Sequence, residues 1–206
     1  NIDEKLLHNL IFQQSSKNPD QSDLWLVNED YIYFKGTSEK KLFDISLNNE
    51  KILKENLTPE EERFRLSLGE DRFQKKPDIL LFPDEQKCII IEFKNPDKNV
   101  SEHLNQINHY ATLILNLSKP EFKFNAFYGY LIGEKVDPND VRAYDAEFKH
   151  AYHFDYLFRS NKTIAGMFGQ ADGSLYTEVI KYSTLLKRAK KRNDIFIQKI
   201  MNNNTI

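Results

Sequence analysis

Cysteine is nearly absent from the sequence, since Cys88 is the only one among 206 residues. A single thiol cannot form an internal disulfide, so small disulfide-stabilised secreted scaffolds are excluded. Cys88 opens the apolar run 88–91, and no histidine is positioned to activate it, so core packing explains it better than a nucleophilic role. We therefore expect a reduced thiol and a cytoplasmic protein.

The chain also lacks a long hydrophobic run and an excess of one charge. No stretch approaches the roughly 18 apolar residues that span a bilayer, and no signal peptide opens the chain, so we expect no membrane partner. With 29 basic and 31 acidic residues, the formal net charge is −2. That balance argues against a basic coat over the whole surface, although local basic patches are compatible with it.

Repeats and low-complexity linkers are absent as well, which indicates one domain over residues 1–206. The 15 Phe and 10 Tyr residues supply enough aromatic side chains to fill a substantial core. Because the first residue is Asn1 and not Met, we expect a processed chain or a fragment of a longer protein.

Hydrophobic periodicity indicates that helices alternate with strands. The spacing of apolar residues predicts helices over 3–12, 101–115, 138–149 and 183–201. Short β-type runs predict strands over 24–27, 31–34, 78–82, 88–94, 124–132, 167–168 and 175–182. Residues 35–75 have no pattern clear enough to assign. The alternation predicts an α/β (α+β) fold in which helices flank a mixed central β-sheet.

Two strands in the middle of the chain place acidic side chains opposite each other. If Phe82 pairs with Cys88 across the intervening loop, the same register sets Asp78 opposite Glu92. Two facing carboxylates repel each other unless a cation lies between them, and hard oxygen ligands suit Mg²⁺ or Mn²⁺. Strand alternation puts Lys94 on the same face as Glu92. The hairpin therefore predicts two acids and one amine positioned for metal-assisted phosphodiester hydrolysis.

The same residues resemble a known family signature. Pro77-Asp78, thirteen further residues and Glu92-Phe93-Lys94 resemble the PD-(D/E)xK motif of the restriction-endonuclease-like nucleases. The resemblance implies a restriction-endonuclease-like core in which Asp78 and Glu92 ligate Mg²⁺, helped by the backbone carbonyl of Phe93. It further implies that Lys94 positions or activates the attacking water, and that the products carry 5′-phosphate and 3′-hydroxyl ends.

The helix that follows this motif adds a second likeness. Gln106 and Tyr110 lie one turn apart on one helix face, which resembles the Q-x-x-x-Y element of RecB-like nucleases. The resemblance implies that both residues support the catalytic site. The family also has an acid on its first core helix, for which Glu4 is the candidate metal ligand and Glu62 the alternative.

Three further segments, 7–12, 24–29 and 176–180, resemble the C-terminal nuclease-like region of bacterial proteins whose N-terminal part is a GHKL-type ATPase. Several such proteins are linked to phage defence. This likeness implies an ATPase domain in the same parent chain or complex, and a role in bacterial anti-phage defence.

Basic residues before the motif and on the last helix are candidates for contacts with DNA phosphates. They are Arg72, Lys75, Lys76, Lys187, Arg188, Lys190, Lys191 and Arg192. A basic run on a helix is commonly only a solvated face, so that interpretation stays open beside the functional one. His150 and His153 have no third ligand nearby in the sequence, so we expect no zinc site there.

These observations lead to three hypotheses. The first is a Mg²⁺-dependent deoxyribonuclease, expected to act as an endonuclease, that hydrolyses phosphodiesters through a metal-activated water. The second is a nuclease-fold module that binds nucleic acid without cleaving it. The third is an interaction domain that forms homo-oligomers or docks on a partner ATPase through residues 124–132 or the last helix. The sequence does not decide whether the substrate is DNA or RNA, whether it is single- or double-stranded, or whether one or two metal ions act.

Overall fold

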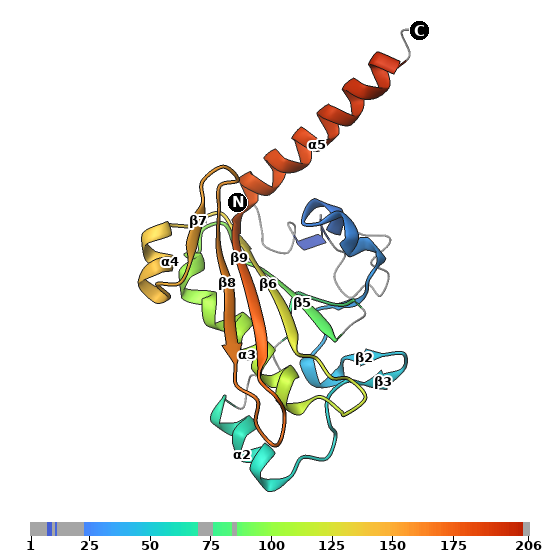
Figure 1. Ribbon diagram of the computed structural model, residues 1–206, viewed down its shortest axis with the longest axis vertical. Coiled ribbons are helices and arrows are strands. Elements are labelled where there is room, and N and C mark those ends of the chain that lie inside the picture. Colours follow the sequence, from blue (N-terminus) through green and yellow to red (C-terminus); the bar gives the residue numbers. More distant parts are fainter. Residues whose placement is uncertain (1–7, 10, 12–22, 70–75, 84–85, 204–206) are drawn as a thin grey trace.

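The computed structural model describes residues 8, 9, 11, 23–69, 76–83 and 86–203. Its centre is a seven-stranded mixed sheet with the strand order β1-β4-β5-β6-β9-β8-β7 (Figure 1). The strands of this sheet are β1 Lys35–Ser38, β4 Ile79–Phe82, β5 Lys87–Phe93, β6 Ala126–Gly133, β7 Lys149–Ala151, β8 Tyr156–Ile164 and β9 Gly173–Lys181. A separate two-stranded hairpin is formed by β2 Ser46–Leu47 and β3 Glu50–Lys51.

Four α-helices within the described ranges flank the sheet. They are α2 Pro59–Ser67, α3 Leu104–Leu117, α4 Pro138–Tyr144 and α5 Tyr182–Asn203. Short 3-10 helices are η2 Leu24–Leu26, η3 Glu29–Tyr33, η4 Leu42–Asp44 and η6 Val100–His103. In Figure 1, α3 crosses behind the sheet, whereas α2 and α5 lie at opposite ends of the molecule and α5 projects away from it. The expected mixed α/β fold is confirmed, and it agrees with a restriction-endonuclease-like core.

None of the helices in the described part of the chain is long and apolar enough to cross a membrane.

Three parallel strands define the edge of the sheet that matters for the site. β5 pairs in parallel with β6, and β6 pairs in parallel with β9. Their carboxyl ends, Phe93, Gly133 and Lys181, therefore lie along one edge, which we name the carboxyl edge. Helix α5 begins at Tyr182, directly after β9, so its first turn also lies at this edge.

Strand alternation gives the sheet two buried faces. On one face Cys88 packs in a cluster with Ile107 of α3, and on the other face Ile91 packs in a cluster with Leu24 of η2. The helix predicted over 101–115 is α3, and its apolar positions are all buried: Leu104, Ile107, Ala111, Ile114 and Leu115. Cys88 is fully buried as predicted, and burial raises the pKa of its thiol.

The predicted hairpin and its register are confirmed. β4 and β5 are antiparallel, with Ile79 opposite Ile91 and Leu81 opposite Ile89. One further step along the same register sets Asp78 opposite Glu92 at the carboxyl edge. Leu80 and Phe82 pack in the cluster that contains α3, whereas Ile79 and Leu81 pack in the cluster on the other face, so a slip by one residue would exchange the two sets.

The two strands predicted over 24–27 and 31–34 are wrong, since both segments lie in or next to 3-10 helices. The Asn28 side chain accepts a hydrogen bond from the Asp30 backbone nitrogen and caps η3. Tyr31 and Phe34 then contact each other at a ring distance of 5.9 Å. That spacing of three residues fits a 3-10 turn, and a run of aromatic residues alone does not distinguish it from a strand.

Several other boundaries also differ from prediction. The helix expected over 138–149 ends at Tyr144, and part of its remainder forms β7. No strand forms at 167–168; the antiparallel partner of β9 is β8, and the register of this pair shifts between Arg159 and Lys162. That irregularity interrupts the alternation by which a strand is recognised.

At the other boundaries, a 3-10 turn capped by Asn99 precedes α3, where Ser101 was the predicted cap. The helix predicted over 3–12 falls mostly outside the described residues, although His8, Asn9 and Ile11 are helical.

Gly129 of β6 sets how closely α3 approaches the sheet. A Cβ atom at this position would lie 2.5 Å from Cγ2 of Ile107, a fully buried β-branched residue. We expect Gly129→Ala to lower the free energy of unfolding by about 1–3 kcal/mol, because the overpacked contact must shift. Urea denaturation would measure the change beside Tyr144→Ala, an exposed position expected to be neutral. Wild-type stability of the glycine variant would contradict close packing of α3.

Candidate active site

The hairpin formed by β4 and β5 brings two acids together at the carboxyl edge. The backbone nitrogen of Asp78 donates to Oε1 of Glu92 at 3.3 Å. The backbone nitrogen of Phe93 donates to Oδ2 of Asp78 at 2.6 Å. Each carboxylate is therefore oriented by the backbone of the opposite strand.

A lysine and a glutamine complete the surroundings of Glu92. The Lys94 Nζ atom donates to Glu92 Oε2 at 2.9 Å, and the Gln106 side-chain nitrogen donates to the same oxygen at 2.7 Å. Gln106 also lies 3.4 Å from the hydroxyl of Tyr110, one turn further along α3. The structure thus brings together Asp78, Glu92, Lys94, Gln106 and Tyr110, the residues that the sequence singled out. Their catalytic roles stay predictions.

Burial governs the charge state of this group. Glu92 is only 1% exposed, and its burial raises the pKa of the carboxyl, as does the negative charge of Asp78. Lys94 opposes this rise through its charge and its hydrogen bond. Burial likewise raises the pKa of Tyr110, which therefore keeps its hydroxyl proton. In the absence of a cation, two acids and one lysine are thus held in an electrostatically unfavourable arrangement.

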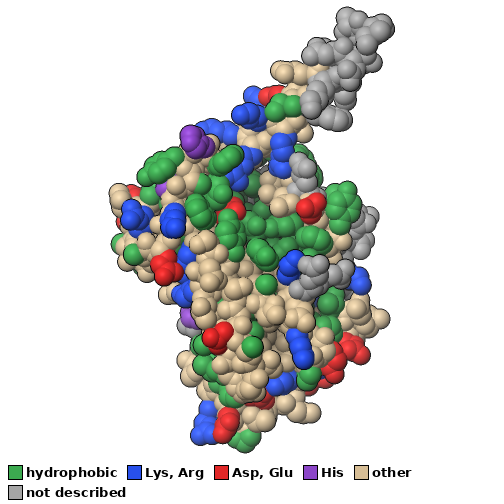
Figure 2. All heavy atoms as spheres, in the orientation of Figure 1, with side chains coloured by type: hydrophobic (Ala, Val, Ile, Leu, Met, Phe, Trp, Pro, Cys, Tyr) green, Lys and Arg blue, Asp and Glu red, His purple; other side chains and the backbone are tan. Residues whose placement is uncertain are grey.

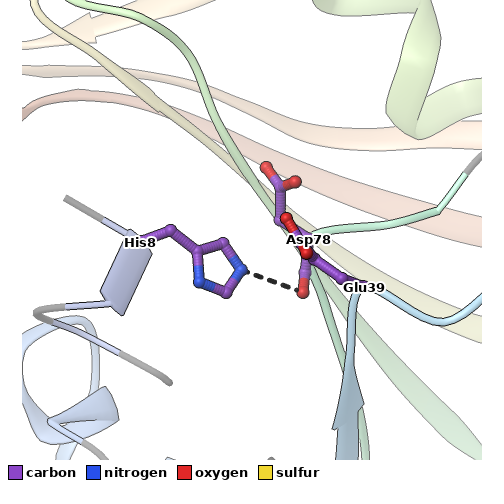
Figure 3. Close-up of side chains that lie close together, drawn as sticks. All are labelled: His8, Glu39 and Asp78. Atoms are coloured by element: carbon purple, nitrogen blue, oxygen red, sulfur yellow. Dashed lines mark hydrogen bonds between the residues drawn. The ribbon is translucent and has the colours of Figure 1, made fainter. Parts of the chain in front are cut away.

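Two residues that the sequence did not single out as ligands, His8 and Glu39, lie close to Asp78 (Figure 3). His8, Glu39 and Asp78 each offer one ligand atom, and these atoms all lie within 4.8 Å of one another. The buried His8 ring places Nε2 3.2 Å from the backbone oxygen of Asp78 and 3.4 Å from Oγ of Ser38. Nitrogen and carboxylate ligands at such separations can hold a divalent cation.

His8 and Glu39 differ in how far the sequence could have indicated them. His8 lies in the predicted helix 3–12, one turn from Glu4, and a histidine next to an acid could have been considered as a ligand. Glu39 carried no signal, because it follows β1 in the unassigned region. Its position depends on backbone geometry: φ is 49°, and its nitrogen donates to the carbonyl oxygens of Pro77 and Asp78. The turn after β1 therefore clamps Glu39 beside the start of β4.

The other proposed ligands are distributed differently. Glu4 lies outside the described residues. Glu62 lies on α2, at the far end of the molecule from α5, and pairs with Arg65, so it is not brought to the site (Figure 1). Within the described ranges, His8, Glu39 and Asp78 form the sole group of three potential metal ligands.

The predicted phosphate contacts also fall into groups. Arg72 and Lys75 lie outside the described residues, and Lys76 is exposed just before the site. On α5, Lys187, Lys190 and Lys191 are exposed. The two arginines of that helix are half-buried: Arg188 donates to the backbone oxygen of Phe154, and Arg192 to those of Trp25 and Leu26. Contact of these residues with DNA stays a prediction.

The raised pKa of Glu92 gives the stability of the metal-free protein a defined pH dependence. An acid whose folded pKa exceeds its unfolded value of about 4.5 costs stability as pH rises above that value. We expect Glu92→Gln, which cannot ionise, to melt about 3 °C or more above the wild type at pH 8 in EDTA. The gain should shrink at pH 5. Thermal denaturation followed by circular dichroism would measure it; an equal difference at both pH values would contradict the raised pKa.

Comparison with known proteins adds a family to this geometry. A family model described as the type I restriction enzyme R protein N terminus matches residues 2–146. No curated protein and no solved structure gives a match. The matched span is more than half of the chain and contains the hairpin with Asp78, Glu92 and Lys94, together with α3. The chain therefore belongs to the family of type I restriction enzyme R protein N-terminal regions, a restriction-enzyme-related, nuclease-like family.

Proposed function

We propose that this chain is a metal-dependent nuclease that hydrolyses phosphodiester bonds of DNA through a metal-activated water. One observation carries the proposal: Asp78 and Glu92 face each other across a fixed hairpin, with Lys94 Nζ 2.9 Å from Glu92. Membership of a restriction-enzyme-related family supports action on DNA. We further propose that the chain acts as an endonuclease.

The donor set fits a hard divalent cation. Asp78 and Glu92 offer carboxylate oxygens, and we propose the backbone carbonyl of Phe93 as a third ligand, with Mg²⁺ as the ion and Mn²⁺ as a substitute. The raised pKa of Glu92 supports this assignment, because a positive charge between the two acids would relieve their repulsion. When bound, such an ion would lower the pKa of a water ligand and offset negative charge on the phosphate.

The surrounding residues have separate roles. Lys94 is within hydrogen-bonding distance of a Glu92 oxygen, so its ammonium can also reach a water or phosphate oxygen at that carboxylate. Gln106 holds the same oxygen from α3 and orients it. A cavity of about 290 Å³, lined by Gln106, Tyr110 and His109 among others, lies beside these side chains. We propose that the substrate backbone passes along this cavity.

His8 and Glu39 extend the proposal to a second cation. Asp78 belongs both to this group and to the proposed Mg²⁺ position between Asp78 and Glu92. His8 reaches Asp78 from the opening helix, and Glu39 reaches it from the turn after β1. Two divalent cations held close together are a common arrangement for in-line phosphodiester hydrolysis. We therefore propose that His8 and Glu39 help to hold a second ion.

The wider setting is also part of the proposal. The hydrogen bond from Gln106 to Glu92 supports a RecB-like variant of the site, because it links the Q-x-x-x-Y element directly to the acidic pair. We propose a cytoplasmic protein in bacterial anti-phage defence, with a GHKL-type ATPase domain in the same chain or complex. Homo-oligomers are compatible with this proposal.

Substitution of the acids or the lysine should abolish cleavage. We expect Asp78→Asn, Glu92→Gln and Lys94→Ala each to slow nicking of supercoiled plasmid by at least about 100-fold, because each removes a ligand or a charge from the transition state. The measurement compares Mg²⁺, Mn²⁺ and EDTA at equal protein concentrations.

The matched control for this experiment is Glu61→Gln. Glu61 of α2 is another buried carboxylate paired with a lysine, Lys54, but it lies away from the hairpin. The Glu61→Gln variant should cleave the plasmid at the wild-type rate. Full activity of all three site variants would sink the assignment, and an inert wild type that still binds DNA would favour the nuclease-fold binding module.

Cation stoichiometry tests the proposed roles of His8 and Glu39. We expect isothermal titration with Mn²⁺ to give two ions per wild-type chain, and one ion for Glu39→Ala, because the Asp78–Glu92 position is left intact. Glu121→Ala removes an exposed acid elsewhere and should still bind two. A single ion in the wild type, unaffected by Glu39→Ala, would restrict the site to one cation.

A further inference from the structure

A second cavity, of about 640 Å³, lies at the base of α5 and away from the acidic pair. Its wall includes Glu178 of β9, which alternates with Val179, a residue of the cluster that packs against α3. Glu178 therefore projects from the opposite sheet face to α3, whereas Glu92 hydrogen-bonds to α3. Both sites are near the carboxyl edge but open on different faces.

Aromatic rings form one side of this cavity. Phe154 is 63% exposed, and its ring centroid lies 6.4 Å from that of Tyr156, which lies 5.9 Å from that of Phe158. Figure 2 shows hydrophobic side chains gathered over this part of the sheet, with Lys and Arg side chains beside them at the base of α5. Exposed ring faces next to positive charge are the surface on which unpaired bases stack.

The basic residues of α5 divide into two kinds here. Arg188 and Arg192 fix the helix to the body, since each donates to backbone oxygens and lies over a ring, that of Tyr156 or Trp25. Lys187 and Lys191 are one helical turn apart, exposed, and line the cavity. Neither has an ion-pair partner among the described residues.

The same wall also contains carboxylates. Glu178 accepts a hydrogen bond from the hydroxyl of Tyr176 at 2.7 Å, and Asp155 accepts one from Oγ1 of Thr184 at 2.9 Å. A site built for a bare phosphate or a lipid headgroup would exclude such acids. A nucleotide matches the whole set, because its phosphate is anionic, its base presents an aromatic face, and its amino groups donate to carboxylates.

We infer that this cavity binds an unpaired nucleotide of a DNA single strand. The base lies against Phe154 with its amino edge toward Glu178, and the adjoining phosphates lie between Lys187 and Lys191. The ring of Tyr156, over which Arg188 lies, is next to that of Phe154. This binding requires no metal ion, so it can be tested separately from the proposed cleavage, and neither result decides the other.

Fluorescence anisotropy in EDTA tests this inference on the full 206-residue chain. The probes are a labelled 20-nucleotide single strand, the matching duplex, and a free nucleoside monophosphate as competitor. We expect Lys187→Ala/Lys191→Ala to weaken single-strand binding at least about fivefold and to reduce the slope of log affinity against log salt by about 1.4. Phe154→Ala should weaken the same complex at least about fivefold through lost stacking.

Matched variants keep the test specific. Lys41→Ala/Lys149→Ala removes two exposed lysines that do not line the cavity, and Tyr144→Ala removes an exposed aromatic residue of α4. Both should bind within about twofold of the wild type, and circular dichroism should show all variants folded.

Three results would overturn the inference. Equal losses for Lys41→Ala/Lys149→Ala and Lys187→Ala/Lys191→Ala would indicate general charge attraction. Duplex binding as tight as single-strand binding, without dependence on Phe154, would exclude an unpaired base. Full displacement of the strand by equimolar monophosphate would assign the cavity to a free nucleotide.

Discussion

The buried carboxylate of Glu92 is the interaction on which the rest of the site depends. A carboxylate withdrawn from water must be compensated, and here Lys94, Gln106 and the backbone of Asp78 converge on it. Each partner comes from a different segment, so this one group fixes the relation of β4, β5 and α3. A nuclease site placed on exposed side chains would not impose that geometry.

The opposite side of the same strand is held by rings and not by charges. Phe93 points away from Glu92, and its ring meets His8 edge-on at 5.2 Å and stacks on Tyr182 at 6.4 Å. The hydroxyl of Tyr182 also donates to the backbone oxygen of Lys94 at 3.1 Å. The first turn of α5 and His8 of the opening helix therefore both contact Phe93 on the sheet face opposite to Glu92.

The parts of this molecule that sequence predicts well are those with strong local patterns. The apolar runs of β4 and β5 and the short loop between them predict the hairpin register, and the juxtaposition of Asp78 and Glu92 follows from that register. Glu39 could not be predicted, because its place depends on a left-handed turn and on contacts with residues far along the chain. The aromatic run 31–34 is wrongly predicted to be a strand for a related reason. Tyr31 is buried and Tyr33 is exposed, whereas a strand would place both on the same face, and the sequence alone does not show this difference.

The sheet order has a consequence for how the chain can be divided. The family match ends at residue 146, yet β6 pairs along its full length with β9, which begins at Gly173. A protein cut after the matched span would leave β6 with bare amide and carbonyl groups along a strand whose side chains are mostly buried. Such an open strand invites intermolecular pairing and aggregation. Residues 173–181 therefore complete the hydrogen bonding of β6 in the nuclease-like core, although they lie outside the span that matches the family.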